Sequence, residues 1–171
     1  MKDRAINKTK FFIASLASAY FLYYTLSYTD WHFIDSANLF IHEAGHFIFM
    51  PLGRFMELLG GSLTQVLLPA VFVIYFYGQQ QYFSASLVLF WVGQNIINVS
   101  VYASDAIFMR LPLIGGPDVL HDWNNILQML GILEYTKIIG VGIYILGLIV
   151  ILSAIYSSFY YSLSRNTPLS L

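Results

Sequence analysis

The sequence predicts an all-α fold, a polytopic bundle of transmembrane helices. Of its 171 residues, 58% are hydrophobic and only 10% are charged, whereas a globular domain carries about 25% charged residues. The apolar residues fall in long runs separated by short polar turns. An apolar run of about 18 residues or more is typical of a helix that crosses a bilayer. We therefore expect a single integral membrane domain over residues 1–171.

Polar turns, prolines and glycines divide the chain into about five spans. Residues 29–32 end the first apolar run, and Pro51 ends or kinks the second helix. Gly60 and Gly61 favour a turn before the third span, and residues 78–81 separate the third span from the fourth. The predicted spans are 11–28, 33–52, 63–77, 82–104 and 138–160.

The connection over residues 106–137 is expected to hold a short amphipathic helix. From Val119 onward, four apolar side chains recur at helical spacing on one face. They are Trp123, Ile126, Leu127 and Leu130.

Basic residues predict the orientation of the chain in the membrane. With five spans and a cytoplasmic N-terminus, only Arg165 falls on the far side, which satisfies the positive-inside rule. The C-terminus is then expected on the opposite side. The basic residues on the cytoplasmic side are Lys2, Arg4, Lys8, Lys10, Arg54, Arg110 and Lys137.

Composition also excludes some partners and ligands. The net charge of −1 provides no basic surface, so no nucleic-acid partner is expected. Cysteine is absent, which excludes disulfides and thiolate metal ligands. We expect membrane lipid to surround the helices.

A metal-binding pattern lies inside the second predicted span. His42-Glu43-Ala44-Gly45-His46 matches H-E-x-x-H. Residues i and i+4 share one helix face, so His42 and His46 can bind one ion while Glu43 lies beside them as a base for water. Ionisable groups within a span are costly and are usually functional, which favours a Zn²⁺ site over a structural polar cluster.

Two polar stripes are expected to face the same cavity. Asn38 precedes the two histidines on their helix face together with Asp35, and either residue could support an imidazole or cap the helix start. On the fourth span, Gln94, Asn98 and Asp105 share one face with Tyr102. Helix–helix hydrogen bonds could also account for the amides. We expect Asn38, Gln94 and Asn98 to line the cavity.

A hydrolytic zinc site needs a third protein ligand. The candidates are Asp105, Asp118, His121 and Asp122. We favour His121, because the predicted topology brings its loop to the end of the H-E-A-G-H helix. The alternative for His121 is a helix cap. Asp105, Asp118 and Asp122 are alternative ligands or partners of a ligand.

The motif on an apolar helix, followed by a glycine-rich turn and a span rich in Asn and Asp, resembles the site-2 protease family of intramembrane zinc metalloproteases. The resemblance implies that His42 and His46 bind zinc and that Glu43 is the general base. It also implies a later Asp ligand, usually followed by Gly. Residues 116–119, Gly-Pro-Asp-Val, match that later motif only in part.

The predicted function is therefore that of a membrane-embedded zinc hydrolase, and the resemblance implies that it is a peptidase. The substrate would be a membrane-embedded peptide, or another amide or ester such as a lipid. A separate adaptor protein could supply selectivity, since the chain is short. The alternative from another class is a non-catalytic metal-binding membrane protein, in which Glu43 would be dispensable.

Overall fold

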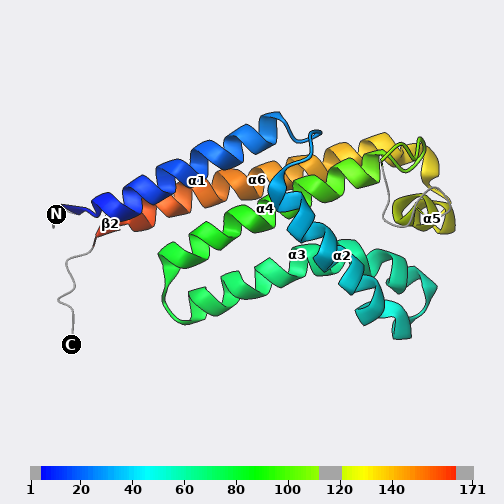
Figure 1. Ribbon diagram of the computed structural model, residues 1–171, viewed down its shortest axis with the longest axis horizontal. Coiled ribbons are helices and arrows are strands. Elements are labelled where there is room, and N and C mark those ends of the chain that lie inside the picture. The colour runs from blue at the N-terminus through cyan, green and yellow to red at the C-terminus, as the bar shows by residue number, and fades with distance from the viewer. Residues whose placement is uncertain (1–4, 112–120, 165–171) are drawn as a thin grey trace.

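The computed structural model describes residues 5–111 and 121–164, and its regular elements are helices apart from two strands of two residues each. The longer helices run along the long axis of the molecule, and a shorter helix crosses them (Figure 1). In chain order the elements are β1 Ala5–Ile6, α1 Lys8–Leu26, α2 Phe33–Phe49, η1 Met50–Leu52, α3 Arg54–Gly78, α4 Tyr82–Ser104, α5 Asp122–Met129, η2 Leu133–Tyr135, α6 Thr136–Ser162 and β2 Leu163–Ser164.

Helix α4 is the centre of the bundle. It packs along α6 and contacts α1 and α3. Its Phe90 and Ile97 are fully buried against Tyr24 of α1 and against Ile151 and Ala154 of α6. A second apolar cluster joins the C-terminal part of α4 to α5 through Trp123 and Leu127. Helix α5 is therefore anchored to the bundle by its buried face, as its amphipathic pattern predicts.

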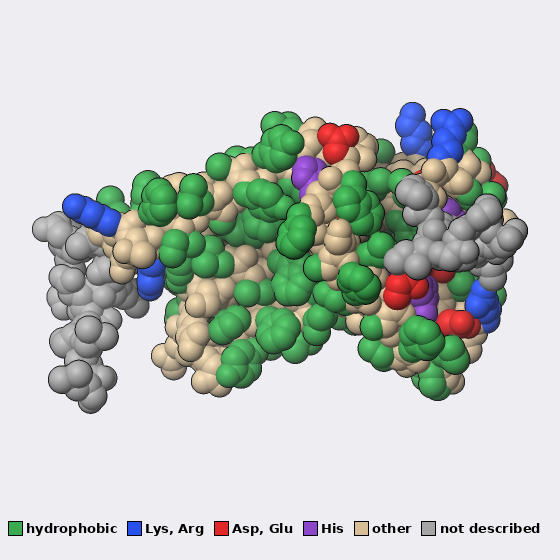
Figure 2. Space-filling model, in the orientation of Figure 1, with side chains coloured by type: hydrophobic (Ala, Val, Ile, Leu, Met, Phe, Trp, Pro, Cys, Tyr) green, Lys and Arg blue, Asp and Glu red, His purple; other side chains and the backbone are tan. Residues whose placement is uncertain are grey.

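Three helical segments are long and apolar enough to cross a membrane: Arg54–Gly78, Tyr82–Ser104 and Leu133–Ser162. Their outward faces carry side chains that water would not favour, such as Ile74, which is 71% exposed, and Ile149, which is 54% exposed. On the face in Figure 2, hydrophobic side chains cover the middle, while Lys and Arg gather at the two ends. These features indicate a membrane protein. Among the described helices, α1 and α2 do not meet the same criteria, and α2 has only 17 residues.

The turn predicted at Gly60 and Gly61 does not form. Helix α3 begins at Arg54 and continues through both glycines and through Pro69. The glycines instead allow α2 to lie close to α3, because a Cβ atom at Gly60 would come within 2.6 Å of the Phe49 Cβ. Small residues have this role in many membrane helix pairs. The third helix is therefore longer than the predicted span over residues 63–77.

The two ends of the described chain lie side by side. Strands β1 and β2 pair in antiparallel fashion, and Asn7 N donates to Ser162 O at 3.0 Å. Residues in direct contact cannot lie on opposite sides of a bilayer. Residues 5–6 and 163–164 therefore lie at the same end of the bundle, whereas the sequence predicts the two termini on opposite sides of the membrane.

Candidate metal centre

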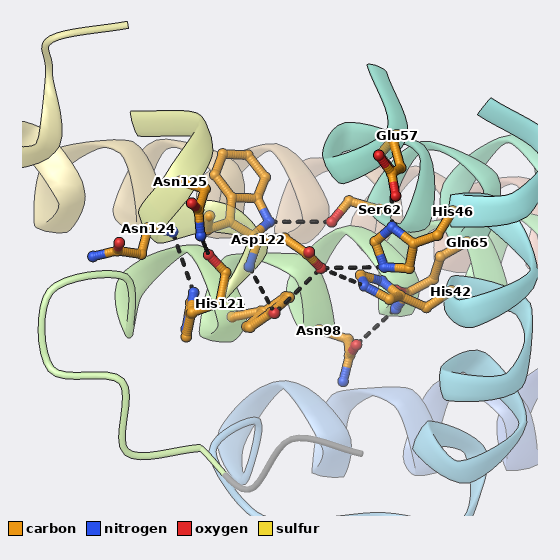
Figure 3. A network of polar contacts seen from close by, with 12 residues as sticks. His42, His46, Glu57, Ser62, Gln65, Asn98, His121, Asp122, Asn124 and Asn125 are labelled. Carbon is orange, nitrogen blue, oxygen red and sulfur yellow. Dashed lines mark hydrogen bonds and ion pairs between the residues drawn. The ribbon is translucent and has the colours of Figure 1, made fainter. Parts of the chain in front are cut away.

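Helix α2 carries both motif histidines on the face that packs against α3. His42 is buried and His46 is half-buried. The spacing of four residues places the two imidazole rings next to each other, with their centroids 4.9 Å apart. The two rings thus face the same region between α2, α3 and α5 (Figure 3).

Asp122 completes this arrangement from the start of α5. Its Oδ2 lies 3.1 Å from His42 Nε2 and 3.3 Å from His46 Nε2. One donor atom of each of the three residues lies within 4.8 Å of the others, so this group could hold a metal ion. Figure 3 shows Asp122 directed toward the two imidazoles.

The other nitrogen of each ring is already occupied. His46 Nδ1 lies 2.8 Å from the backbone carbonyl of Glu57, which can only accept, so this nitrogen must carry the proton. His42 Nδ1 lies 3.2 Å from the side-chain oxygen of Gln65, which likewise accepts. When Nε2 is unprotonated, as a metal ligand must be, each ring therefore presents an Nε2 lone pair toward Asp122. Two lone pairs and a carboxylate oxygen at one point repel each other unless a cation lies among them, and this donor set fits a divalent metal.

Tyr102 and Trp123 hold Asp122 in place. The Tyr102 hydroxyl accepts from the backbone N of Asp122 at 3.1 Å and donates to its Oδ2 at 3.2 Å. The indole Nε1 of Trp123 donates to Ser62 Oγ on α3 at 3.1 Å. Burial alone would raise the pKa of Asp122, but in the metal-free protein protonated Nε2 atoms of His42 and His46 donate to the carboxylate, and these hydrogen bonds lower that pKa to about 2. The carboxylate is therefore ionised at neutral pH. The hydrogen bond with Asp122 in turn raises the pKa of His46 to about 9.

His121, the predicted third ligand, is not brought into the group. It is the N-cap of α5, where its Nδ1 accepts from Asn124 N at 3.2 Å. Its Nε2 faces Asp105 Oδ2 at 3.5 Å. In Figure 3, Asp122 lies between His121 and the two motif histidines. Both ring nitrogens are thus directed elsewhere, so the structure does not bring His121 together with the two motif histidines. The next residue, Asp122, takes the position beside His42 and His46.

The remaining candidates for the third ligand are separated from the histidines or lie outside the description. Asp105 ends α4, and its Oδ2 accepts from Leu111 N at 2.8 Å, so it closes a turn beside His121. Asp118 lies outside the described residues.

A cavity of about 490 Å³ opens beside the three donor residues. Glu43 lies on its wall together with His42, His46 and Asp122, and Leu39, Leu58 and Val99 supply apolar surface. Asn98 lines the cavity as predicted. Asn38 and Gln94 do not, because they are 1% and 0% exposed and bond to each other behind the cavity wall.

Residues beyond the motif also form the cavity. Tyr28, Asp30 and Trp31 reach it from the turn between α1 and α2, and Arg54 and Glu57 reach it from the start of α3. Gln65, which contacts His42 directly, carried no signal in the sequence, since a lone Gln on an apolar helix resembles a helix-packing amide.

Comparison of the chain with protein-family models, with curated proteins and with solved structures found no match.

Proposed function

We propose that this protein is a zinc-dependent hydrolase embedded in the membrane, with peptide bonds as its substrates. The observation that carries the proposal is the convergence of His42 Nε2, His46 Nε2 and Asp122 Oδ2 beside Glu43 on one cavity wall. Three protein ligands of the His and carboxylate type, with an open side, are typical of catalytic rather than structural zinc sites. The resemblance to site-2 proteases through the H-E-A-G-H motif supports the same conclusion.

The proposed chemistry assigns each group one task. A zinc ion held by His42, His46 and Asp122 would supply Lewis-acid activation of a water molecule and of the substrate carbonyl. Glu43 takes a proton from that water and delivers it to the leaving amine. No hydrogen bond within the described residues engages the Glu43 carboxylate, so it is available for this exchange. The apolar part of the cavity accepts the substrate side chains.

The location of the site in a membrane protein narrows the range of possible substrates. The cavity lies among helices whose outer faces are apolar, which favours a substrate that is itself held in the membrane. We propose a membrane-embedded peptide as the substrate, with membrane lipid around the bundle and an adaptor protein as a partner for selectivity. The basic residues near the N-terminus favour a cytoplasmic N-terminal end. The pairing of β1 with β2 supports the same side for residues 163–164.

The test compares Glu43→Gln with Glu57→Gln in purified protein reconstituted in lipid. Glu57 also lies on the cavity wall, but its carboxylate pairs with Arg54 at 3.1 Å. Cleavage of fluorogenic transmembrane peptides should fall about 10²- to 10⁴-fold in Glu43→Gln. The zinc content should stay at the wild-type level, and Glu57→Gln should cleave normally.

Two results would change the proposed function. Hydrolysis of lipid esters or acyl amides, but not of any peptide, would keep the chemistry and change the substrate class. Bound zinc in the wild type, with no Glu43-dependent turnover on peptides, esters or amides, would instead identify a non-catalytic metal-binding protein.

A further inference from the structure

Two amides, the buried Gln65 and the half-buried Asn98, connect His42 to a carboxylate two helical turns away. His42 Nδ1 lies 3.2 Å from Gln65 Oε1, Gln65 Nε2 donates to Asn98 Oδ1 at 2.6 Å, and Asn98 Nδ2 donates to Asp35 Oδ1 at 3.0 Å. This amide chain, Gln65–Asn98–Asp35, crosses from α3 to α4 and returns to α2. Asp35 and His42 are seven positions apart, which is about 10 Å along a helix.

The hydrogen bonds of the amide chain can run in only one donor-to-acceptor direction, because the amide chain ends at Asp35. Every described partner of this carboxylate is a donor. Oδ1 accepts from Tyr24 Oη at 3.0 Å, from Gln94 Nε2 at 2.8 Å and from Asn98 Nδ2, while Oδ2 accepts from His32 N at 2.8 Å. An ionised carboxylate can only accept, so it suits this set of donors.

An amide transmits this direction because it donates at one end and accepts at the other. The amino group of Asn98 is used on Asp35, so its oxygen faces Gln65. The amino group of Gln65 is then used on Asn98, and its oxygen faces His42. The imidazole must therefore donate from Nδ1, and in the neutral ring this leaves the Nε2 lone pair directed toward Asp122.

A second series of hydrogen bonds also ends at Asp35 and runs in the same donor-to-acceptor direction. It begins at Trp91, whose indole Nε1 can only donate and does so to Asn38 Oδ1 at 2.9 Å. Asn38 Nδ2 donates to Gln94 Oε1 at 2.7 Å, and Gln94 Nε2 donates to Asp35. Trp91 thus acts as the donor terminus and Asp35 as the acceptor terminus, so the orientation of the amides is determined at both ends.

We propose that Asp35, acting through Asn98 and Gln65, is a positioning residue that fixes the tautomer of His42 so that Nε2 is free to bind the metal. This inference rests on the proposed metal site, and it adds the residues that prepare one ligand for it. Partners of a metal-bound histidine commonly set the ring's tautomer and orientation, and their loss costs about 10- to 100-fold in metal affinity. Here that partner is an amide oriented by a distant carboxylate.

The test measures zinc affinity by competition with a chromophoric chelator for the wild type, Gln65→Met and Gln65→Glu. Met has a similar length but cannot accept strongly from His42, so Gln65→Met should lose about 10- to 100-fold in affinity. Glu accepts from Nδ1–H without help from Asn98, so Gln65→Glu should retain the affinity that Gln65→Met loses. Equal losses in the two variants would overturn the acceptor role of Gln65.

Asn98→Leu tests the transmission, because Asn98 has no hydrogen bond to His42 or Asp122. In zinc-loaded protein labelled with ¹⁵N-histidine, the His42 Nδ1–H resonance should shift and exchange faster with water in Asn98→Leu than in the wild type. An unchanged resonance together with wild-type zinc affinity would overturn the proposal. A wild-type protein that binds no zinc would refute the proposed function itself and this inference with it, and the two failures are thus distinguishable.

Discussion

Asp122 Oδ2 lies 3.1 Å from His42 Nε2, although 80 positions separate the two residues in the chain. The contact joins the start of α5 to the middle of α2. The contact depends on the packing of α5 against α3 and α4, which positions Asp122. Within the described residues, Asp122 contacts α2 only through the two histidines. The metal centre is therefore a product of the tertiary fold and is absent from any single helix.

Gly61 allows α3 to approach the imidazole of His42. A Cβ atom at this position would lie 2.5 Å from His42 Nε2. We predict that Gly61→Ala displaces the ring and lowers zinc affinity by about 10- to 100-fold, comparable to the loss of a ligand's supporting contact. Gly142→Ala is the matched control, since a Cβ there meets nothing within 4 Å. Isothermal titration with zinc checks the prediction, and equal affinities in the two variants would contradict it.

Tyr102 is expected to hold Asp122 for metal binding. Tyr102→Phe removes the hydroxyl that bonds both the backbone and the carboxylate of Asp122. Leaving these groups unpaired costs about 1–3 kcal/mol, and zinc affinity should fall by about tenfold or more. Tyr144→Phe removes a hydroxyl that bonds Thr25 O, away from the site, and should bind zinc as the wild type does. Weaker binding in Tyr144→Phe alone would contradict this account.

Acidification should destabilise the metal-free protein through Asp122. The pKa of Asp122 is lowered to about 2 in the folded state from an ordinary value of 3.8. A carboxylate with a depressed folded pKa contributes stability above its unfolded pKa and loses it as the pH falls toward the folded pKa. Thermal unfolding in detergent with a chelator should therefore show a loss of stability between about pH 4 and pH 2 that is smaller in Asp122→Asn. Identical pH profiles for the two proteins would exclude this role.

Local patterns in the sequence predicted the helices and the histidine pair well. The apolar run over residues 82–104 coincides with α4, and the i, i+4 spacing of His42 and His46 places both rings on one face. These features depend on periodicity within one helix, which a single sequence displays directly.

Features that depend on contacts between helices were predicted less well. Gly60 and Gly61 indicated a turn, because a glycine pair breaks an isolated helix, but packing against α2 retains the helix through them. His121 and Asp122 are adjacent, so the choice between them depended on which residue caps α5. A helix cap is set by backbone geometry, and sequence proximity alone could not decide which of the two faces the histidines.

The central claim is tested most directly by the zinc content of His121→Asn and Asp122→Asn, measured by mass spectrometry beside the wild type and His42→Ala. Asn caps a helix well, so His121→Asn keeps the start of α5 intact while it removes an imidazole. The account predicts about one zinc per chain in the wild type and in His121→Asn, and its loss in Asp122→Asn and His42→Ala. Zinc retained in Asp122→Asn and lost in His121→Asn would contradict the account.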